Sequence, residues 1–435
     1  MAEISPFAAL RYNTGKVDLG DVVTQPYDKI TPKMQDEYYQ ASPYNLVRII
    51  LGRPEGAETD HNNRYTQAAD FLKTWRQNAI LAQDSSPSIY AYSQRFPVPG
   101  TSQTVERRGF IAVGKLYDYE EKIVYRHEQT LAKPKSDRLN LLRATHAHFG
   151  QIFMLYSDPA QTIDSLLFDD DGYEWQEVTD EYEVVHRLRR VSDPAILNIV
   201  KTEMADRKLI IADGHHRYET ALNFRKETAG SDDPCLIENA RRVMMTFVNM
   251  DSPGLLILPT HRIVFGLESF DQEQFVKKAG ELYDIKQLGA VDASEATKSL
   301  ANSGKKAISF IAATKAGNLL LVAKPESATK IPAEFSSRQR KLDVVHLHSL
   351  LLERTLGISR EQVTNQQHIR YLRAADEALK SAQADPEVNV AFLMNPVSIE
   401  QVQEVAFAGE VLPQKSTDFF PKLLSGLTIY SLDGC

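Results

Sequence analysis

The chain has 435 residues, of which 43% are hydrophobic and 25% are charged, a balance typical of folded globular proteins. Its formal net charge of -8 argues against a general nucleic-acid-binding protein, which would normally carry a basic surface. The presence of only two cysteines argues against a disulfide framework and favours a reducing compartment. The first residues lack a signal-peptide pattern and no apolar run is long enough to cross a bilayer, so we expect a cytoplasmic protein without membrane partners.

The first part of the chain mixes predicted strands and helices. Apolar residues at helical spacing predict a helix over residues 63–82, and this stripe is more typical of a core face than of a binding surface. A second helix is expected over residues 136–143. Runs rich in apolar and aromatic residues predict strands over residues 46–51, 88–92, 108–113 and 151–156, of which the second and third form a hairpin.

Residues 207–222 combine a short apolar strand, a glycine turn and the start of a helix. Asp213 and Gly214 form the turn, and His215, His216 and Arg217 begin the helix. A glycine lets the backbone approach a ligand closely, and the free N–H groups of a helix start favour an anion. This stretch therefore predicts an anion-binding turn.

The later part of the chain forms a small lobe of strands and helices and then becomes richer in helices. A cluster of proline and serine residues near 325–340 indicates a boundary. We therefore expect a mixed α/β fold in one multi-lobed unit, with an N-terminal lobe over 1–160, a central lobe over 161–335 and a helix-rich C-terminal lobe over 336–435.

Further polar residues gather in short clusters away from this turn. A general base must be a carboxylate or imidazole within reach of a proton, and Glu128 and Asp28 are the main candidates, with Asp213 as a rival. An ion pair in a turn is an equally good interpretation of each of them. The other candidate binding residues are Arg126, His127, Arg138, His261, Arg262, Lys415, Ser416, Thr417 and Lys422.

Phosphate is the ligand that best matches these cations. Arg217 and Arg126 could hold phosphate oxygens with paired hydrogen bonds, while Lys415 and Lys422 neutralise charge. The Walker pattern, the protein-kinase motifs and the serine-hydrolase elbow are all missing, so a kinase would need another fold. Zinc is disfavoured because adjacent histidines do not share a helix face, and the metal ligands stay unknown.

The chain contains five distinctive motifs: Pro26-Tyr27-Asp28, His127-Glu128-x-Thr130, Asp137-Arg138-Leu139, residues 212–221 and Lys415-Ser416-Thr417-x-Phe419-x-Pro421-Lys422. In sequence and in order, these motifs resemble the bacterial and archaeal family catalogued as domain of unknown function 1015. The Asp-Gly-His-His-Arg turn within residues 212–221 is also similar to a turn of the ParB and sulfiredoxin superfamily, so the resemblance implies a core with elements of that fold. Asp418 departs from the family pattern, in which an aromatic residue precedes Phe419.

The resemblance implies a kinase of free L-serine that produces O-phosphoserine from pyrophosphate, or from a nucleotide such as ATP. In this hypothesis Glu128 or Asp28 accepts the hydroxyl proton, and the Asp213 turn with His216 and Arg217 binds the donor phosphates. Lys415, Thr417 and Lys422 would close over the site. A magnesium ion would bridge donor oxygens and have few protein ligands.

Two other functions stay open. One is a non-catalytic, nucleotide-responsive binding protein of the ParB type, although no basic recognition helix is visible in the sequence. The other is a structural protein whose polar clusters only hold its lobes together. The sequence leaves the oligomeric state open as well.

Overall fold

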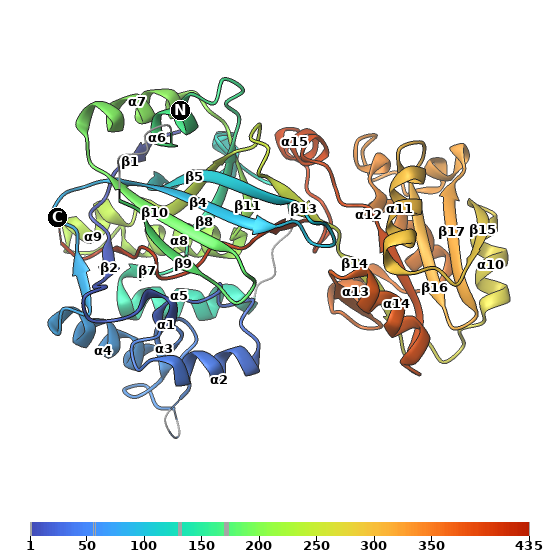
Figure 1. Ribbon diagram of the computed structural model, residues 1–435, viewed down its shortest axis with the longest axis horizontal. Coiled ribbons are helices and arrows are strands. Elements are labelled where there is room, and N and C mark those ends of the chain that lie inside the picture. The colour runs from blue at the N-terminus through green and yellow to red at the C-terminus, as the bar shows by residue number, and fades with distance from the viewer. Residues whose placement is uncertain (1, 55, 57, 129–132, 169–173, 435) are drawn as a thin grey trace. The chain divides into compact units, whose positions relative to one another are not determined.

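The computed structural model describes residues 2–54, 56, 58–128, 133–168 and 174–434. The chain divides into two compact units, which are described separately (Figure 1). Unit 1 contains Met1–Arg126, Thr130–Leu255 and Pro421–Cys435, and unit 2 contains His127–Gln129 and Leu256–Phe420. The boundary expected near residue 160 falls inside unit 1, and the boundary expected near residue 335 falls inside unit 2.

Unit 1 is built on a mixed nine-stranded sheet with the order β6-β11-β8-β12-β5-β4-β10-β9, and with β1 paired to β5. The pairs β6 with β11 and β8 with β12 are parallel, and the other pairs of this sheet are antiparallel. The strands are β1 (Ile4–Ser5), β4 (Ile89–Pro97), β5 (Thr104–Lys115), β6 (Val124–Arg126), β8 (Ile152–Tyr156), β9 (Gln176–Thr179), β10 (Val185–Val191), β11 (Leu209–Asp213) and β12 (Arg242–Asn249).

Helices flank this sheet, and in Figure 1 α1 to α4 gather below it while α6 and α7 lie above it. Aliphatic and aromatic side chains of the sheet form one buried core with residues of α6, α7 and α8, and a second core surrounds Trp75 of α4. The helices are α1 (Leu19–Val22), α2 (Pro32–Ala41), α3 (Val47–Ile50), α4 (Arg64–Gln77), η1 (Tyr119–Glu121), α5 (Lys133–Thr145), α6 (Thr162–Phe168), α7 (Pro194–Ala205), α8 (His215–Thr228) and α9 (Pro234–Asn239). Two small pairs, β2 (Leu10–Tyr12) with β3 (Leu81–Gln83) and β7 (Ala147–His148) with β21 (Tyr430–Ser431), complete the unit.

The predicted strand over residues 46–51 is wrong, because this segment forms the short helix α3. The backbone N–H of Val47 donates to Oδ1 of Asn45 at 2.9 Å, and Val47, Ile49 and Ile50 are all buried. A short apolar run fits a buried helix turn as well as a buried strand, so its pattern could not separate the two. The predicted hairpin of β4 and β5 is confirmed by their antiparallel pairing.

Unit 2 contains a fully antiparallel six-stranded sheet with the order β15-β17-β16-β19-β14-β18. Its strands are β14 (His261–Phe265), β15 (Tyr283–Gly289), β16 (Ser309–Thr314), β17 (Gly317–Ala323), β18 (Ile369–Leu372) and β19 (Val388–Met394), and β13 (Leu256–Leu258) pairs separately with β20 (Asp418–Phe420). The helices are α10 (Gln272–Gly280), α11 (Ala293–Gly304), η2 (Pro325–Lys330), η3 (Gln339–Lys341), α12 (Asp343–His346), η4 (Leu347–Thr355), α13 (Arg360–Thr364), α14 (Ala375–Ala384) and α15 (Ile399–Phe407). The mixed α/β class predicted from the sequence is confirmed, and none of the described helices is long and apolar enough to span a membrane.

Candidate functional site

The predicted strand, turn and helix over residues 207–222 are confirmed in unit 1. Strand β11 ends at Asp213, Gly214 follows with a φ of 92°, and α8 begins at His215. This left-handed backbone favours glycine, and a Cβ atom on Gly214 would lie only 3.1 Å from the Nε atom of Arg217. The turn therefore needs glycine both for its backbone angle and for the space that the arginine occupies.

Asp213 is the centre of a cluster of cations. Its carboxylate lies 3.0 Å from Nη2 of Arg217 and 3.8 Å from Nζ of Lys422. Burial alone would raise the pKa of Asp213, but the positive charges of Lys422, Arg217 and Lys29 hold this pKa well below its usual range. Asp213 is therefore ionised at neutral pH, and the cations around it outnumber it.

Arg107 and Gln94 hold the backbone next to Lys422. Arg107 is 1% exposed, and its guanidinium donates to Oε1 of Gln94 at 3.1 Å and to the carbonyl oxygen of Pro421 at 2.6 Å. The side chain of Gln94 in turn donates to the carbonyl oxygen of Lys422 at 2.8 Å. Burial lowers the pKa of Arg107 to about 10. Sequence reasoning missed Arg107 and Gln94. The charge of Arg107 at an inward-facing position of a strand could have indicated it, because a buried charge needs partners.

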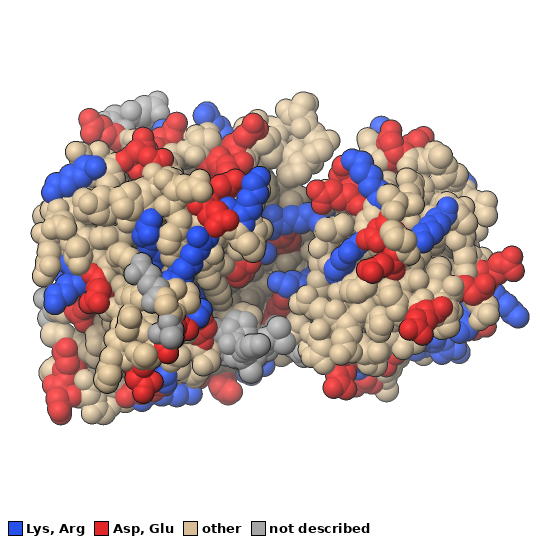
Figure 2. Space-filling view, turned by 90° about the horizontal axis from the view of Figure 1, so that it is seen from below, with Lys and Arg blue, Asp and Glu red and all other residues tan. Residues whose placement is uncertain are grey.

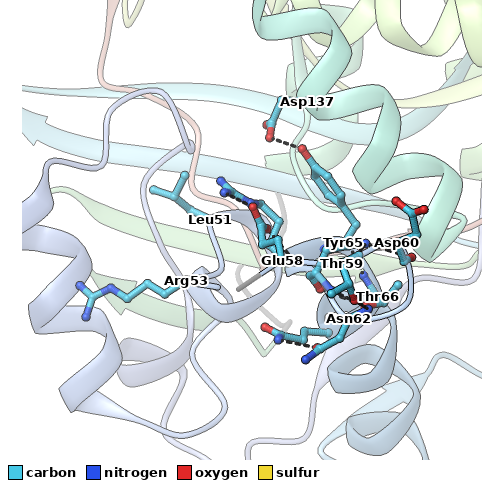
Figure 3. Close-up of polar contacts among 12 residues, drawn as sticks. Leu51, Arg53, Glu58, Thr59, Asp60, Asn62, Tyr65, Thr66 and Asp137 are labelled. Atoms are coloured by element: carbon cyan, nitrogen blue, oxygen red, sulfur yellow. Dashed lines mark hydrogen bonds and ion pairs between the residues drawn. The ribbon is translucent and has the colours of Figure 1, made fainter. Parts of the chain in front are cut away.

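Next to this cluster a pocket opens between Tyr27 of the Pro-Tyr-Asp motif, Arg138 of the Asp-Arg-Leu motif and Arg217. The guanidinium of Arg138 lies 4.1 Å from the ring centroid of Tyr27 and donates to the carbonyl oxygen of Ile50 at 2.8 Å. Arg138 also pairs with Asp137. Figure 3 shows the hydroxyl of Tyr65 pointing at Asp137, to which it donates at 2.9 Å. Three motifs that lie far apart in the sequence thus line one pocket.

The other predicted residues of unit 1 lie nearby but make different contacts. Arg126 is exposed and its guanidinium lies 5.1 Å from the ring centroid of Tyr119. Asp28 is exposed, and its charge acts on Tyr27. His215 is buried at the start of α8, whereas the adjacent His216 is partly exposed.

Unit 2 holds the remaining predicted residues, in a cluster around the turn at residues 412–418. The carboxylate of Glu128 accepts a hydrogen bond from the backbone N–H of Lys415 at 2.8 Å. Nε2 of His127 lies 2.6 Å from the hydroxyl of Thr417, and Ser416 donates to the carbonyl oxygen of Pro413. Segment 127–128 therefore positions this turn, and Lys415 adopts a φ of 58° within it.

Arg262 and His261 lie on β14 beside that turn and are both buried. Arg262 donates to the carbonyl oxygen of Lys415 at 3.0 Å, and burial lowers its pKa to about 10 despite the nearby charge of Glu128. Burial lowers the pKa of His261 to about 4, and its Nδ1 accepts the N–H of Met394 at 3.2 Å. His261 is therefore neutral and has a structural contact.

Asp418, which departs from the expected aromatic residue, forms an ion pair with Arg373. Its Oδ1 accepts from Nη2 of Arg373 at 2.9 Å, and the aspartate is only 6% exposed. The aspartate at position 418 is thus neutralised by Arg373, which follows β18.

Among the described residues, no group of three or more histidine, cysteine, aspartate or glutamate side chains is arranged to hold a metal ion. Figure 2 shows acidic and basic side chains interspersed over the visible face of each unit.

A family model described as "Protein of unknown function (DUF1015)" matches residues 4–345. The chain belongs to this family. The match includes the Pro-Tyr-Asp, His-Glu, Asp-Arg-Leu and Asp-Gly-His-His-Arg motifs, whereas the lysine motif that begins at Lys415 lies beyond it. The membership predicted from the motifs is confirmed.

Three solved structures show distant likenesses. A conserved hypothetical protein from Pyrococcus furiosus is 13% identical with a TM-score of 0.35, covering 72% of this chain and 93% of that one. A free serine kinase mutant in complex with ADP is 12% identical with a TM-score of 0.36, covering 70% and 89%. SbnI from Staphylococcus aureus is 10% identical with a TM-score of 0.33, covering 72% and 87%. At these scores the likenesses do not define the activity of this chain. No curated protein sequence matches the chain.

Proposed function

We propose that the protein is a small-molecule kinase that transfers a phosphoryl group from pyrophosphate or a nucleotide to the hydroxyl of free L-serine. The observation that carries this proposal is the excess of cations around Asp213. Arg217 and Lys422 pair with this carboxylate, and the charge of Arg107 also acts on it. The N-terminus of α8, a helix of 14 residues, adds the partial positive charge of its helix dipole, so the cluster favours a polyanionic ligand.

The chemistry of phosphoryl transfer matches such a cluster because its catalysis consists mostly of positioning and electrostatic stabilisation. In the proposed step the serine oxygen forms a bond to the terminal phosphorus of the donor. The bond from that phosphorus to its bridging oxygen breaks, and the leaving group departs with the electron pair. The hydroxyl proton passes to a carboxylate, which yields O-phosphoserine.

Asp213 is poorly suited to accept this proton, because the cations that lower its pKa make it a weak base. Glu128 and Asp28 are the proposed bases. Glu128 lies in the unit 2 cluster and Asp28 beside the unit 1 pocket. Lys422 of unit 1 is proposed to contact the donor, and Lys415 and Thr417 of unit 2 stay proposed as phosphate-binding residues.

A magnesium ion suits this reaction because it neutralises charge on the transferring phosphates. Asp213 is already paired with Arg217 and Lys422, so at most one of its carboxylate oxygens could bind the magnesium ion. Donor oxygens and water would supply the others. The choice of L-serine and of pyrophosphate comes from the family resemblance of the motifs.

The test is to incubate the protein with magnesium, L-serine and either pyrophosphate or ATP, and to follow O-phosphoserine by ³¹P NMR. We expect product with one of the two donors. Absence of product with both donors, from protein with an intact circular-dichroism spectrum, would refute the kinase proposal.

A non-catalytic phosphate-responsive binding protein is the second candidate. The paired state of Asp213 favours it, because the cluster can bind an anion without any base. This function predicts that pyrophosphate or a nucleotide raises the melting temperature while no O-phosphoserine forms.

A further inference from the structure

A second cavity, of about 260 Å³, lies wholly within unit 2. It is formed by the π-helix η4, by α13 and by segment 411–414. Its volume is far larger than the ~10–15 Å³ that one water molecule needs, so it has room for a small organic molecule. Most of its lining lies beyond residue 345, where the match to the family model ends.

The wide winding of η4 brings polar side chains to this cavity. The backbone N–H of Leu356 donates to the carbonyl oxygen of Leu351 at 3.0 Å, a bond between residues five apart, as in a π-helix. The side-chain hydroxyl of Thr355 also donates to the carbonyl oxygen of Leu350 at 2.7 Å. The π-helix is a rare conformation that occurs frequently at functional sites. His348 and Ser349 of this helix line the cavity.

Both of these side chains carry a buried atom without a hydrogen-bond partner among the described residues. They are Nε2 of His348 and Oγ of Ser349, and Ser349 is only 4% exposed. Buried polar groups in folded proteins are normally hydrogen-bonded. A ligand in the cavity could supply the hydrogen bonds that these two atoms lack among the described residues. Burial lowers the pKa of His348 to about 3, which makes it a neutral imidazole. Each group can therefore act as a donor or an acceptor.

Among the described residues that line the cavity, Glu334 and Arg360 are the charged ones, and they form an ion pair of 2.7 Å with each other. These lining residues therefore leave no unpaired charge for a charged ligand. The remaining walls include the aromatic rings of Phe335 and Tyr371 and the aliphatic side chains of Ile358 and Val363.

We propose that this cavity binds an uncharged heteroaromatic ring of about the size of a purine. The flat faces of such a ring pack against the apolar walls, and its edge offers nitrogen donors and acceptors to His348 and Ser349. A hydrocarbon of the same size would leave both polar atoms without partners. The proposal is independent of the kinase activity, because all of its residues belong to unit 2, whereas the Asp213 cluster belongs to unit 1.

Calorimetric titration of the full chain with adenine and with indole tests the proposal. Indole has a similar shape but lacks the ring nitrogens that accept hydrogen bonds. We expect adenine to bind about tenfold more tightly than indole. Adenosine carries the same ring with a ribose but no phosphate, so it binds only if the cavity also admits the ribose. Its binding therefore distinguishes a cavity for a free base from a cavity for a base that is part of a larger ligand.

Variants then locate the binding. Ser349→Ala and His348→Phe should each weaken adenine about fivefold and leave indole unchanged. Arg354→Ala, at an exposed position of the same helix, should bind adenine like the wild type. Equal affinity for adenine and indole in the wild type, or adenine binding that Ser349→Ala leaves unchanged, would overturn the proposal, and neither outcome depends on turnover.

Discussion

The partly buried carboxylate of Asp213 forms ion pairs with Arg217 and Lys422. Removing a carboxylate from water costs several kcal/mol, and this cost is offset only by close opposite charges and hydrogen bonds. Arg217 and Lys422 supply those charges, and the fall in the pKa of Asp213 shows that their attraction exceeds the effect of burial. The carboxylate therefore fixes the positions of Arg217 and Lys422, the cations proposed to contact a phosphate.

Arg217→Gln should reduce turnover in the serine kinase assay by about 10²–10³, because it removes a preorganised cation beside the donor phosphates. The variant protein should also bind pyrophosphate more weakly, since one of the proposed partners of the anion is lost. Steady-state kinetics and calorimetric titration with pyrophosphate measure the two effects.

Lys226→Gln is the matched control, because Lys226 lies on the same helix, is 65% exposed and pairs only loosely with Asp118 at 3.7 Å. It should keep wild-type kinetics. Equal losses of turnover and affinity in both variants would show that removing any positive charge from α8 has this effect, and that Arg217 has no specific role.

Asp343, at the start of α12, should make the stability of unit 2 depend on pH. Burial raises the pKa of this carboxyl to about 7, against an ordinary value of 3.8, although a hydrogen bond with Asn395 opposes the rise. Between these two values the unfolded chain is ionised there while the folded chain keeps its proton. The free energy of unfolding therefore falls as pH rises through this window, by about 2–3 kcal/mol between pH 5 and pH 8.

The variant Asp343→Asn should lack this component, and so lose less stability than the wild type between pH 5 and pH 8. Denaturant unfolding of both proteins at the two pH values measures the difference. Identical pH dependence in the two proteins would contradict the assignment.

At the scale of elements, the junction of β11 and α8 depends on one backbone angle. Gly214 has a φ of 92° and Arg217 packs against it, so the turn and the arginine that folds back over it form one unit. The arginine is held from the other side by the carbonyl oxygen of Gln151, the residue before β8. The junction of β11 and α8 thus orients both the guanidinium of Arg217 and the N-terminus of α8.

Gly214→Ala should lower the stability of unit 1 by about 1–2 kcal/mol, because an L-residue is strained in the left-handed region. It should also weaken pyrophosphate binding, since the added Cβ atom displaces the guanidinium of Arg217. Thermal unfolding and calorimetry measure the two effects. Gly230→Ala, where a Cβ atom meets nothing within 4 Å, should leave the affinity unchanged.

At the scale of the whole molecule, unit 1 is completed by the last residues of the chain. Segment 421–435 brings Lys422 to Asp213 and pairs β21 with β7, and its residues Leu424, Ile429 and Leu432 are almost fully buried. The main segment of unit 2, Leu256–Phe420, is inserted between Leu255 and Pro421. Because Leu256 and Phe420 are opposite each other in the pairing of β13 with β20, the two ends of this insertion lie close together.

A chain of residues 1–255 alone should therefore be unstable, because it lacks the buried side chains of 421–435. Joining Leu255 to Pro421 through a short glycine-serine linker should restore a cooperative thermal transition. Calorimetry of the two proteins tests this. A stable, cooperative 1–255 chain would show that the terminal segment is dispensable.

The sequence alone determined the elements whose cause is local. The apolar run, the glycine and the polar residues of 207–222 specify β11, the left-handed turn and α8, because backbone angle and helix start depend on neighbouring residues. The motifs were likewise sufficient to identify the family. The run at 46–51 was misassigned because its periodicity suits two conformations, and only packing against the Trp75 core selects the helix.

The tertiary structure decided which distant residues meet. Arg107, Gln94 and Lys422 come together because β4 and β5 pair with each other and the chain returns to unit 1 at Pro421, contacts that no local pattern encodes. The pairing of Asp418 with Arg373 has the same origin. Backbone conformation follows from neighbours in the sequence, whereas a charged cluster depends on pairings between strands and segments far apart in the chain.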